Sequence, residues 1–215
     1  MIEKISMHGY ETISKPSENV IVFLEELLSY TEKPINVAEI GIGVGATSVE
    51  IAKRLREFDS YYFFSYQEDV NALDADLKAT DYCKCKLYPM GNSTATYDSY
   101  SWALSSLCLE NNVFFDLVYL DGAHSFFHDA LATVLLKRLI NPGGILIFDD
   151  VFWSHQKSPT QNSKVCPKNL EDYTQEQLET EQIKRVIDLF MENDDEWERI
   201  GDIKWQAVYK KREFL

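Results

Sequence analysis

Short apolar runs alternate with stretches of helical periodicity along most of the chain, and this alternation restricts the fold more than any other feature. The apolar runs predict five strands, at 37–40, 61–66, 84–88, 115–120 and 145–148. Strands separated by helices favour a mostly parallel sheet that is covered by helices on both faces. The fifth run is apolar without interruption, which is typical of a central parallel strand.

The stretches between these runs predict the helices that cover the sheet. Apolar residues recur at helical spacing within 46–58, 70–79, 98–109, 126–139 and 177–191. Residues 152–176 are polar and irregular instead. Because a loop of that length in a compact domain is usually functional or disordered, this segment is expected to be either an active-site loop or a disordered excursion.

The two ends of the chain complete the predicted architecture. Ser17 is placed to cap a helix within an N-terminal helical segment at 1–34. Two further runs, 197–203 and 205–211, are expected to form an antiparallel hairpin at the edge of the sheet. The prediction is therefore one α/β domain over 1–215. It is a doubly wound, mostly parallel, seven-stranded Rossmann-like sheet with an antiparallel C-terminal edge hairpin.

The charge of the chain argues against some classes of partner. Its 35 acidic residues outnumber its 21 basic residues, and the formal net charge is −14. A surface of that sign repels polyanions, so neither nucleic acid nor an anionic membrane is expected as a partner. The longest apolar run near the start is far too short for a membrane span, and the first residues do not resemble a signal peptide. A cytoplasmic location is therefore expected, with the cysteines reduced.

A glycine turn links the first predicted strand to the helix after it. Residues 37–45 read VAEIGIGVG. Glycines allow a tight turn and a close approach of a ligand to the backbone. The third glycine comes two residues after the second, whereas the dinucleotide fingerprint requires three. This spacing argues against a nicotinamide cofactor.

The glycine turn resembles motif I of the class I methyltransferases, which use S-adenosylmethionine (SAM) as methyl donor. In that family the glycines, here Gly41, Gly43 and Gly45, pack against the amino-acid half of SAM. The preceding acidic residue, here Glu39, helps to hold the SAM ammonium group, often through water. The resemblance therefore implies a SAM-dependent methyltransferase, and a turn that serves only chain reversal is the simpler alternative.

Two further segments resemble the family with departures. Such enzymes place an acid on the SAM ribose after the second strand, where this chain has Ser65. Glu68 is the expected substitute, and a solvated loop charge is the alternative interpretation of it. After the third strand the family often has Gly-Asp-Ser or Gly-Asp-Ala near the adenine amino group. This chain has Gly91, Asn92 and Ser93, and the Asn92 carbonyl can accept the same hydrogen bond.

Acidic residues follow the fourth and fifth predicted strands. Asp121 ends one strand, and Asp149 and Asp150 end its expected neighbour. Ligands of a doubly wound sheet collect beyond the carboxyl ends of its strands. Three carboxylates gathered there repel one another unless a cation lies between them, and Mg²⁺ or Mn²⁺ suits such oxygen ligands. Each acid could instead cap a following turn.

These two segments are similar to the metal-dependent small-molecule O-methyltransferases, most of all to the branch that acts on sugar hydroxyls of macrolides and related glycans. In that branch a DG-x-H string supplies a metal ligand and a histidine base, and an acidic pair supplies the other ligands. The resemblance implies Asp121, Asp149 and Asp150 as metal ligands and His124 as base, with Asp121 also beside SAM. It covers about 39–151 and favours a small, sugar-containing hydroxyl acceptor, with a phenolic or other natural-product hydroxyl as the open alternative.

Other functions stay open at this point. A metal-independent N- or carboxyl-methyltransferase, an aminopropyl transferase and a catalytically silent SAM-binding protein are all compatible with the glycine turn. His128 could share a helix face with His124 and act as a ligand, although a surface position is the simpler interpretation. His155, in the segment 152–176, is a further candidate for a base or an acceptor contact. The sequence is also compatible with a homo-oligomer.

Overall fold

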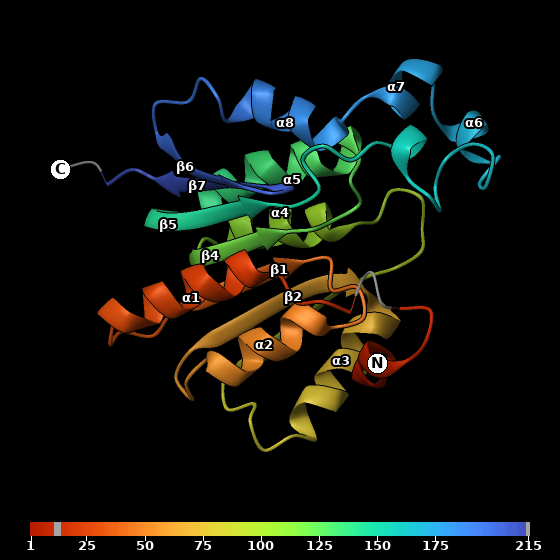
Figure 1. Cartoon of the computed structure of the whole chain (residues 1–215). Helices are drawn as coiled ribbons and strands as arrows, with labels where there is room; N and C mark the ends of the chain where they lie inside the picture. The colour runs from red at the N-terminus through yellow and green to blue at the C-terminus, as the bar shows by residue number, and fades with distance from the viewer. Residues whose placement is uncertain (11–13, 214–215) are drawn as a thin grey trace.

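The computed structural model describes residues 1–10 and 14–213, which form a seven-stranded sheet with helices on both faces (Figure 1). The strand order is β3-β2-β1-β4-β5-β7-β6. The strands are β1 (Asn36–Ile40), β2 (Ser60–Tyr66), β3 (Lys86–Asn92), β4 (Phe115–Leu120), β5 (Ile140–Phe148), β6 (Trp197–Ile203) and β7 (Gln206–Lys211). The first five are parallel, and β7 pairs antiparallel with β5 and β6. The predicted Rossmann-like sheet and its antiparallel edge hairpin are therefore confirmed.

Two sets of helices cover the sheet. One face carries α1 (Glu18–Tyr30), α2 (Ala46–Arg54) and α3 (Gln67–Lys78). The other face carries α4 (Tyr100–Glu110), α5 (Phe126–Leu139) and α8 (Gln182–Phe190). The short elements are η1 (Ile2–Ser6), η2 (His155–Lys157), α6 (Asn169–Asp172) and α7 (Gln175–Glu179). Within the described parts of the chain, no helix is long and apolar enough to cross a membrane.

The side chains of β2 show how one strand supplies two apolar cores. Successive side chains of a strand point to opposite faces of the sheet. Tyr61 and Phe63 are buried in the cluster that includes α1, α2 and α3. Tyr62 and Phe64 belong to the cluster that includes α4, α5 and α8. Because both faces are covered, the strand can carry four aromatic residues in succession.

Serine hydroxyl groups mark the beginnings of three helices. Ser17 accepts a hydrogen bond from a backbone N–H in the first turn of α1, as predicted, and Ser125 does the same for α5. The cap of α4 is Ser99, one residue after the predicted start of this helix. Asp98 instead accepts a hydrogen bond from the Ser93 backbone N–H at 2.6 Å, because the loop before α4 folds back on itself.

Two strand boundaries differ from the prediction because strand pairing decides them. β3 lies at 86–92 rather than 84–88, since it pairs in register with the whole of β2. β5 begins at Ile140, several residues before the apolar run, because Ile140 pairs with Phe115 across a register shift. The glycine-rich stretch after α5 therefore enters the sheet instead of forming a loop.

Two helix predictions were also wrong in detail. α2 ends at Arg54 because Leu55 takes an extended backbone, with φ −68° and ψ 141°. The single helix predicted at 177–191 is divided into α7 and α8. Thr174 forms a capping box that starts α7 early, and the backbone leaves the helical region before α8.

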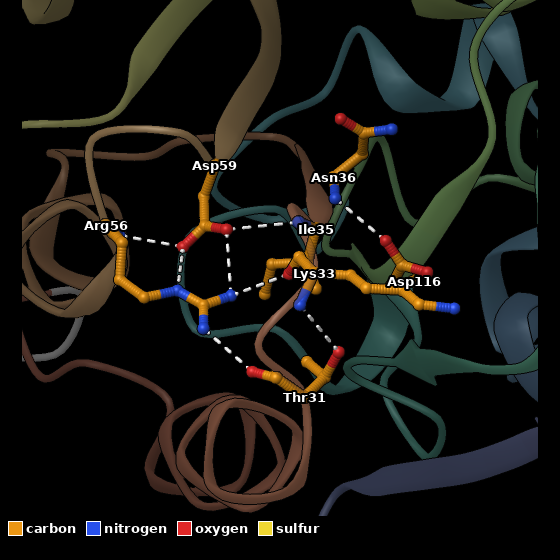
Figure 2. A network of polar contacts seen from close by, with 7 residues as sticks. All are labelled: Thr31, Lys33, Ile35, Asn36, Arg56, Asp59 and Asp116. Atoms are coloured by element: carbon orange, nitrogen blue, oxygen red, sulfur yellow. Dashed lines mark hydrogen bonds and ion pairs between the residues drawn. The ribbon is translucent and has the colours of Figure 1, made fainter.

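Asp59 joins the beginnings of β1 and β2 (Figure 2). These strand starts lie at the end of the sheet opposite to the glycine turn, which follows the last residue of β1. The buried carboxylate of Asp59 accepts hydrogen bonds from the Ile35 N–H at 3.0 Å and from the N–H and Nε of Arg56 at 2.8 and 2.9 Å. The Arg56 guanidinium also donates to the carbonyls of Thr31 and Lys33 at 2.8 and 2.9 Å. This network holds both strand starts in register.

Candidate active site

The carboxyl ends of β2, β1, β4 and β5 lie side by side, and backbone hydrogen bonds continue past them. The first residue after each of three strands donates its N–H to the carbonyl of a neighbouring strand, at 2.9, 2.8 and 3.0 Å: Gly41 to Phe64, Asp121 to Ile40 and Asp149 to Leu120. The glycine turn and the two acidic strand ends are thus held at one edge of the sheet. This is the edge at which doubly wound folds bind ligands.

A cleft of about 670 Å³ opens at this edge. The predicted site residues that line it are Glu39, Gly41, Gly43, Ser65, Asp121, His124, Asp149 and Asp150. The other predicted residues do not line it: Gly45, Glu68, Gly91, Asn92 and Ser93. Further lining residues come from two segments that sequence reasoning left out, Lys15–Asn19 and Lys204–Gln206. The structure therefore joins motif residues with both ends of the chain.

Gly41 shows why glycine must follow β1. Its φ is +84°, and a Cβ atom there would lie 1.8 Å from the carbonyl oxygen of Asp121. No side chain can occupy that space, so the turn approaches the end of β4 with backbone alone. Gly45 is the N-cap of α2, where a Cβ would contact Leu73 and Ile2 rather than the cleft.

Glu39 lies beneath the glycine turn and is almost fully buried. Its carboxylate accepts a hydrogen bond from the Ser48 hydroxyl at 2.6 Å and another from the Tyr61 hydroxyl. Burial raises the pKa of Glu39 to about 7, and the two hydrogen bonds oppose that rise. The motif acid therefore changes charge near neutral pH, at the wall of the cleft.

Asp69 is a second candidate for the acid expected to bind the SAM ribose. The Ser65 hydroxyl, which lines the cleft, lies 3.5 Å from Oδ2 of Asp69. Glu68 is exposed on the first turn of α3. Gly91 packs against the Gln67 side chain instead of lining the cleft. The register of α3 decides which acid faces Ser65, and the sequence motif does not contain that information.

His124 lies among the predicted acids. Its Nε2 is 3.5 Å from Oδ1 of Asp121 and 3.6 Å from Oδ2 of Asp150. His124 and Asp150 both have a φ of +51°, in the left-handed region that costs non-glycine residues about 1–2 kcal/mol. Backbone strain of this kind concentrates at functional sites, where the surrounding structure holds it.

Tyr119 connects the two acidic strand ends. Its hydroxyl donates a hydrogen bond to Asp149 and lies 3.2 Å from Oδ2 of Asp121. Burial, together with the charges of Asp149, Asp150 and Glu39, raises the pKa of Asp121 well above its usual range. Within residues 1–10 and 14–213, no three His, Cys, Asp or Glu side chains form a group spaced to hold a metal ion.

Asp129 anchors the loop that carries His124. Its buried carboxylate accepts hydrogen bonds from the Tyr100 hydroxyl at 2.5 Å and the Ser125 N–H at 2.9 Å. The Tyr100 hydroxyl in turn accepts from the Ala123 N–H at 3.2 Å. The backbone on both sides of His124 is thus tied to one buried group. No motif marks Asp129, which looks like any acid in the first turn of a helix.

The other two candidate histidines have different surroundings. His128 lies on α5, with Nδ1 2.8 Å from the hydroxyl of the serine that caps this helix. His155 is buried, with its ring centroid 4.8 Å from that of Trp153 and 4.4 Å from that of Tyr173. The Trp153 ring lies 5.4 Å from the His124 ring. Trp153 therefore connects the segment 152–176 with His124.

Several solved structures share this fold. The O-methyltransferase TomG from Streptomyces achromogenes, which is involved in tomaymycin synthesis and was solved with SAM, has 14% identity and a TM-score of 0.57; the alignment covers 99% of this chain and 89% of that one. A protein from Corynebacterium glutamicum has 13% identity and a TM-score of 0.62, with 100% and 90% covered. At these identities the likeness shows the fold alone.

A third structure is the MycE methyltransferase of the mycinamycin biosynthetic pathway, solved with Mg, SAH and mycinamycin VI. It has 17% identity and a TM-score of 0.52, and the alignment covers 89% of this chain and 48% of that one. This chain thus corresponds to about half of MycE.

The sequence itself was also compared with protein families and curated proteins. No curated protein sequence matches it. Residues 38–151 match the family described as a methyltransferase domain. That match spans more than half of the 215 residues and includes the glycine turn and both acidic strand ends. The chain belongs to the methyltransferase-domain family.

Proposed function

We propose that this chain transfers a methyl group from SAM to a hydroxyl group of a small, sugar-containing molecule, assisted by a divalent metal and a histidine base. The main observation in support of this proposal is the position of His124. It lies 3.5 Å from Asp121 and 3.6 Å from Asp150, in the same cleft as the glycine turn. The proposed base, the acids and the glycine turn therefore line the same cavity, as methyl transfer to a hydroxyl requires.

The glycine-turn side of the cleft would hold SAM. Gly41 and Gly43 would face its amino-acid half, with Glu39 near the ammonium group. We assign the ribose hydroxyls to Asp69 rather than Glu68, because Asp69 faces the cleft-lining hydroxyl of Ser65. TomG, which has the same fold, was solved with SAM, and this supports SAM as the ligand of the present chain.

The acids of the cleft are of the chemical type that binds a divalent cation, although within the described part of the chain they are not grouped at metal-binding spacing. Asp121, Asp149 and Asp150 offer the carboxylate oxygens that Mg²⁺ and Mn²⁺ prefer. A cation would relieve the like-charge repulsion that raises the pKa of Asp121. Asp149 would exchange its hydrogen bond from Tyr119 for the cation. When bound, the metal would hold the acceptor oxygen and acidify its hydroxyl.

The residues of the chain would then position the acceptor and take its proton. The acceptor oxygen attacks the methyl carbon as the carbon–sulfur bond breaks, and the electron pair of that bond stays on sulfur to give S-adenosylhomocysteine (SAH). The hydroxyl proton passes to Nε2 of His124, a side chain suited to general base catalysis near neutral pH. The Asp129 network would keep His124 in place, since positioning supplies much of the rate of such a transfer.

Calorimetric titration tests this proposal. SAM is titrated into the protein with Mg²⁺ and again with excess EDTA, and Mg²⁺ is titrated separately. We expect saturable SAM binding and a Mg²⁺ isotherm that disappears in Asp149→Ala. Asp188→Ala, which removes a half-exposed acid on α8, is the matched control and should bind Mg²⁺ like the natural chain.

A metal-independent N- or carboxyl-methyltransferase is the second candidate. The hydrogen bond from Tyr119 favours it, because Asp149 already has a partner without a metal. SAM binding that is insensitive to EDTA, with no Mg²⁺ isotherm, would select this candidate. Absence of SAM binding would contradict both. SAM binding without turnover on any acceptor would indicate a silent SAM-binding protein.

A further inference from the structure

The turn between β6 and β7 has an unusual sequence for its geometry. Ile203 pairs with Gln206, so Lys204 and Trp205 form a two-residue hairpin turn. Lys204 has a φ of +61°. Two-residue hairpin turns favour glycine or asparagine at such a position, because a Cβ atom makes the left-handed region unfavourable. Turn chemistry therefore does not explain why lysine and tryptophan stand here.

The position of this turn supplies a reason. The Trp205 carbonyl accepts a hydrogen bond at 2.9 Å from the N–H of Val151, the residue after the acidic pair. Lys204, Trp205 and Gln206 all line the cleft that contains His124. The Trp205 side chain is 63% exposed there. A large aromatic residue is thus exposed in the same cleft as the proposed catalytic groups.

The N-terminal segment completes the same wall. Asn19 donates to the Gln206 side-chain carbonyl at 2.6 Å, and the Gln206 amide donates to the Ser17 hydroxyl at 3.0 Å. The Ser17 N–H donates to the Thr47 hydroxyl at 3.0 Å. All four residues line the cleft. These contacts join segments that are far apart in sequence into one polar surface, in the same cleft as Trp205.

We propose that Trp205, with the amides of Asn19 and Gln206, forms the wall that recognises the methyl acceptor. This inference rests on the proposed function, and it assigns acceptor specificity to residues outside every motif of the chain. An exposed indole offers a flat apolar face to the C–H groups of a sugar ring, and neighbouring amides offer both donors and acceptors to its hydroxyls. Functional sites often keep residues that make the local backbone less stable, because those residues bind a ligand. The turn at Lys204 and Trp205 fits this description.

The first test measures acceptor binding without turnover. A panel of 4-nitrophenyl glycosides is titrated by calorimetry into protein saturated with SAH. We expect at least one glycoside to bind the natural chain and Trp205→Ala to raise its Kd about tenfold or more, as loss of a buried aromatic contact does. Trp102→Ala is the matched control, because Trp102 is 71% exposed on α4 and does not line the cleft. The Kd for SAH should be the same in all three proteins.

The second test separates recognition from folding. The double variant Lys204→Gly/Trp205→Asn places favoured residues in the turn and should raise the midpoint of thermal unfolding by about 2–4 °C. It should nevertheless bind the glycoside as weakly as Trp205→Ala. A more stable protein with weaker acceptor binding would show that the natural turn serves recognition.

The outcomes distinguish this inference from the function on which it rests. If SAH does not bind the natural chain, the proposed function itself fails. If SAH binds but no glycoside does, or if Trp205→Ala and Trp102→Ala bind the glycoside equally well, the acceptor wall is wrong. A parallel loss of SAH binding in Trp205→Ala would also overturn it, because the wall would then belong to the cofactor.

Discussion

The carboxylate of Glu39 and the hydroxyl of Ser48 lie 2.6 Å apart, buried beneath the glycine turn. The Tyr61 hydroxyl donates to the same carboxylate oxygen. Burial outweighs both hydrogen bonds and raises the pKa of Glu39 to about 7. Glu39, the acidic residue of the methyltransferase motif, therefore destabilises the folded chain when it ionises.

Stability is expected to depend on the pH through Glu39. The folded chain holds the proton more tightly than the unfolded chain, so this contribution is fully present below pH 4.5 and is lost as the pH rises to about 7. The difference between the two pKa values corresponds to roughly 3 kcal/mol of unfolding free energy. Denaturant unfolding at pH 5 and at about pH 8 measures it.

Two variants isolate that contribution. Glu39→Gln removes the titrating group and should reduce the fall in unfolding free energy between the two pH values. Glu26→Gln, which changes an exposed acid on α1, should keep the fall of the natural chain. An equal pH dependence in all three proteins would show that Glu39 does not titrate in this range.

Asp69, rather than Glu68, is expected to contribute to SAM affinity. Asp69→Asn should raise the Kd for SAM about tenfold, since a charge-assisted hydrogen bond to a ribose hydroxyl contributes about 1.5–3 kcal/mol. Glu68→Gln on the neighbouring exposed position should leave the Kd unchanged. Calorimetric titration of SAM into the two variants measures both Kd values. A larger rise in Kd for Glu68→Gln than for Asp69→Asn would show that Glu68 binds the ribose.

His124 is expected to act in the chemical step rather than in binding. His124→Gln should lower kcat by about 10²–10⁴-fold, the usual contribution of a general base, and leave the Kd for SAM unchanged. His128→Gln, four residues further along the chain and bonded to the cap of α5, should keep at least half of the rate. Comparable losses of rate in both variants would indicate a structural effect of the loop.

Asp59 is expected to support stability without touching the site. Asp59→Ala removes the carboxylate that pairs with the Arg56 guanidinium and leaves the buried Ile35 N–H without its acceptor, so it should lower the unfolding free energy by about 3–5 kcal/mol. Glu57→Ala, at an exposed neighbouring position, should change it by less than about 0.5 kcal/mol. Because the network lies at the starts of β1 and β2, whereas the cleft lies at their carboxyl ends, SAM binding of the folded variant should be unchanged at low temperature.

The sequence alone determined the sheet, the glycine turn and the acidic strand ends. Apolar runs, the glycine spacing and an acid after a strand are local patterns, and each is decided within about ten residues. The order of parallel strands then follows from the doubly wound fold, which brings Gly41, Asp121 and Asp149 to one edge. For this reason eight of the predicted site residues line one cleft.

Only the tertiary structure decided which neighbours those residues meet. The choice of Asp69 over Glu68 depends on the rotation of α3, and the role of Tyr119 depends on the spacing of β4 and β5. The contact of Asn19 with Gln206 joins positions 187 residues apart, on α1 and β7. Contacts of that kind arise because burial of apolar surface packs distant elements together, and no pattern within one element records which polar groups then meet.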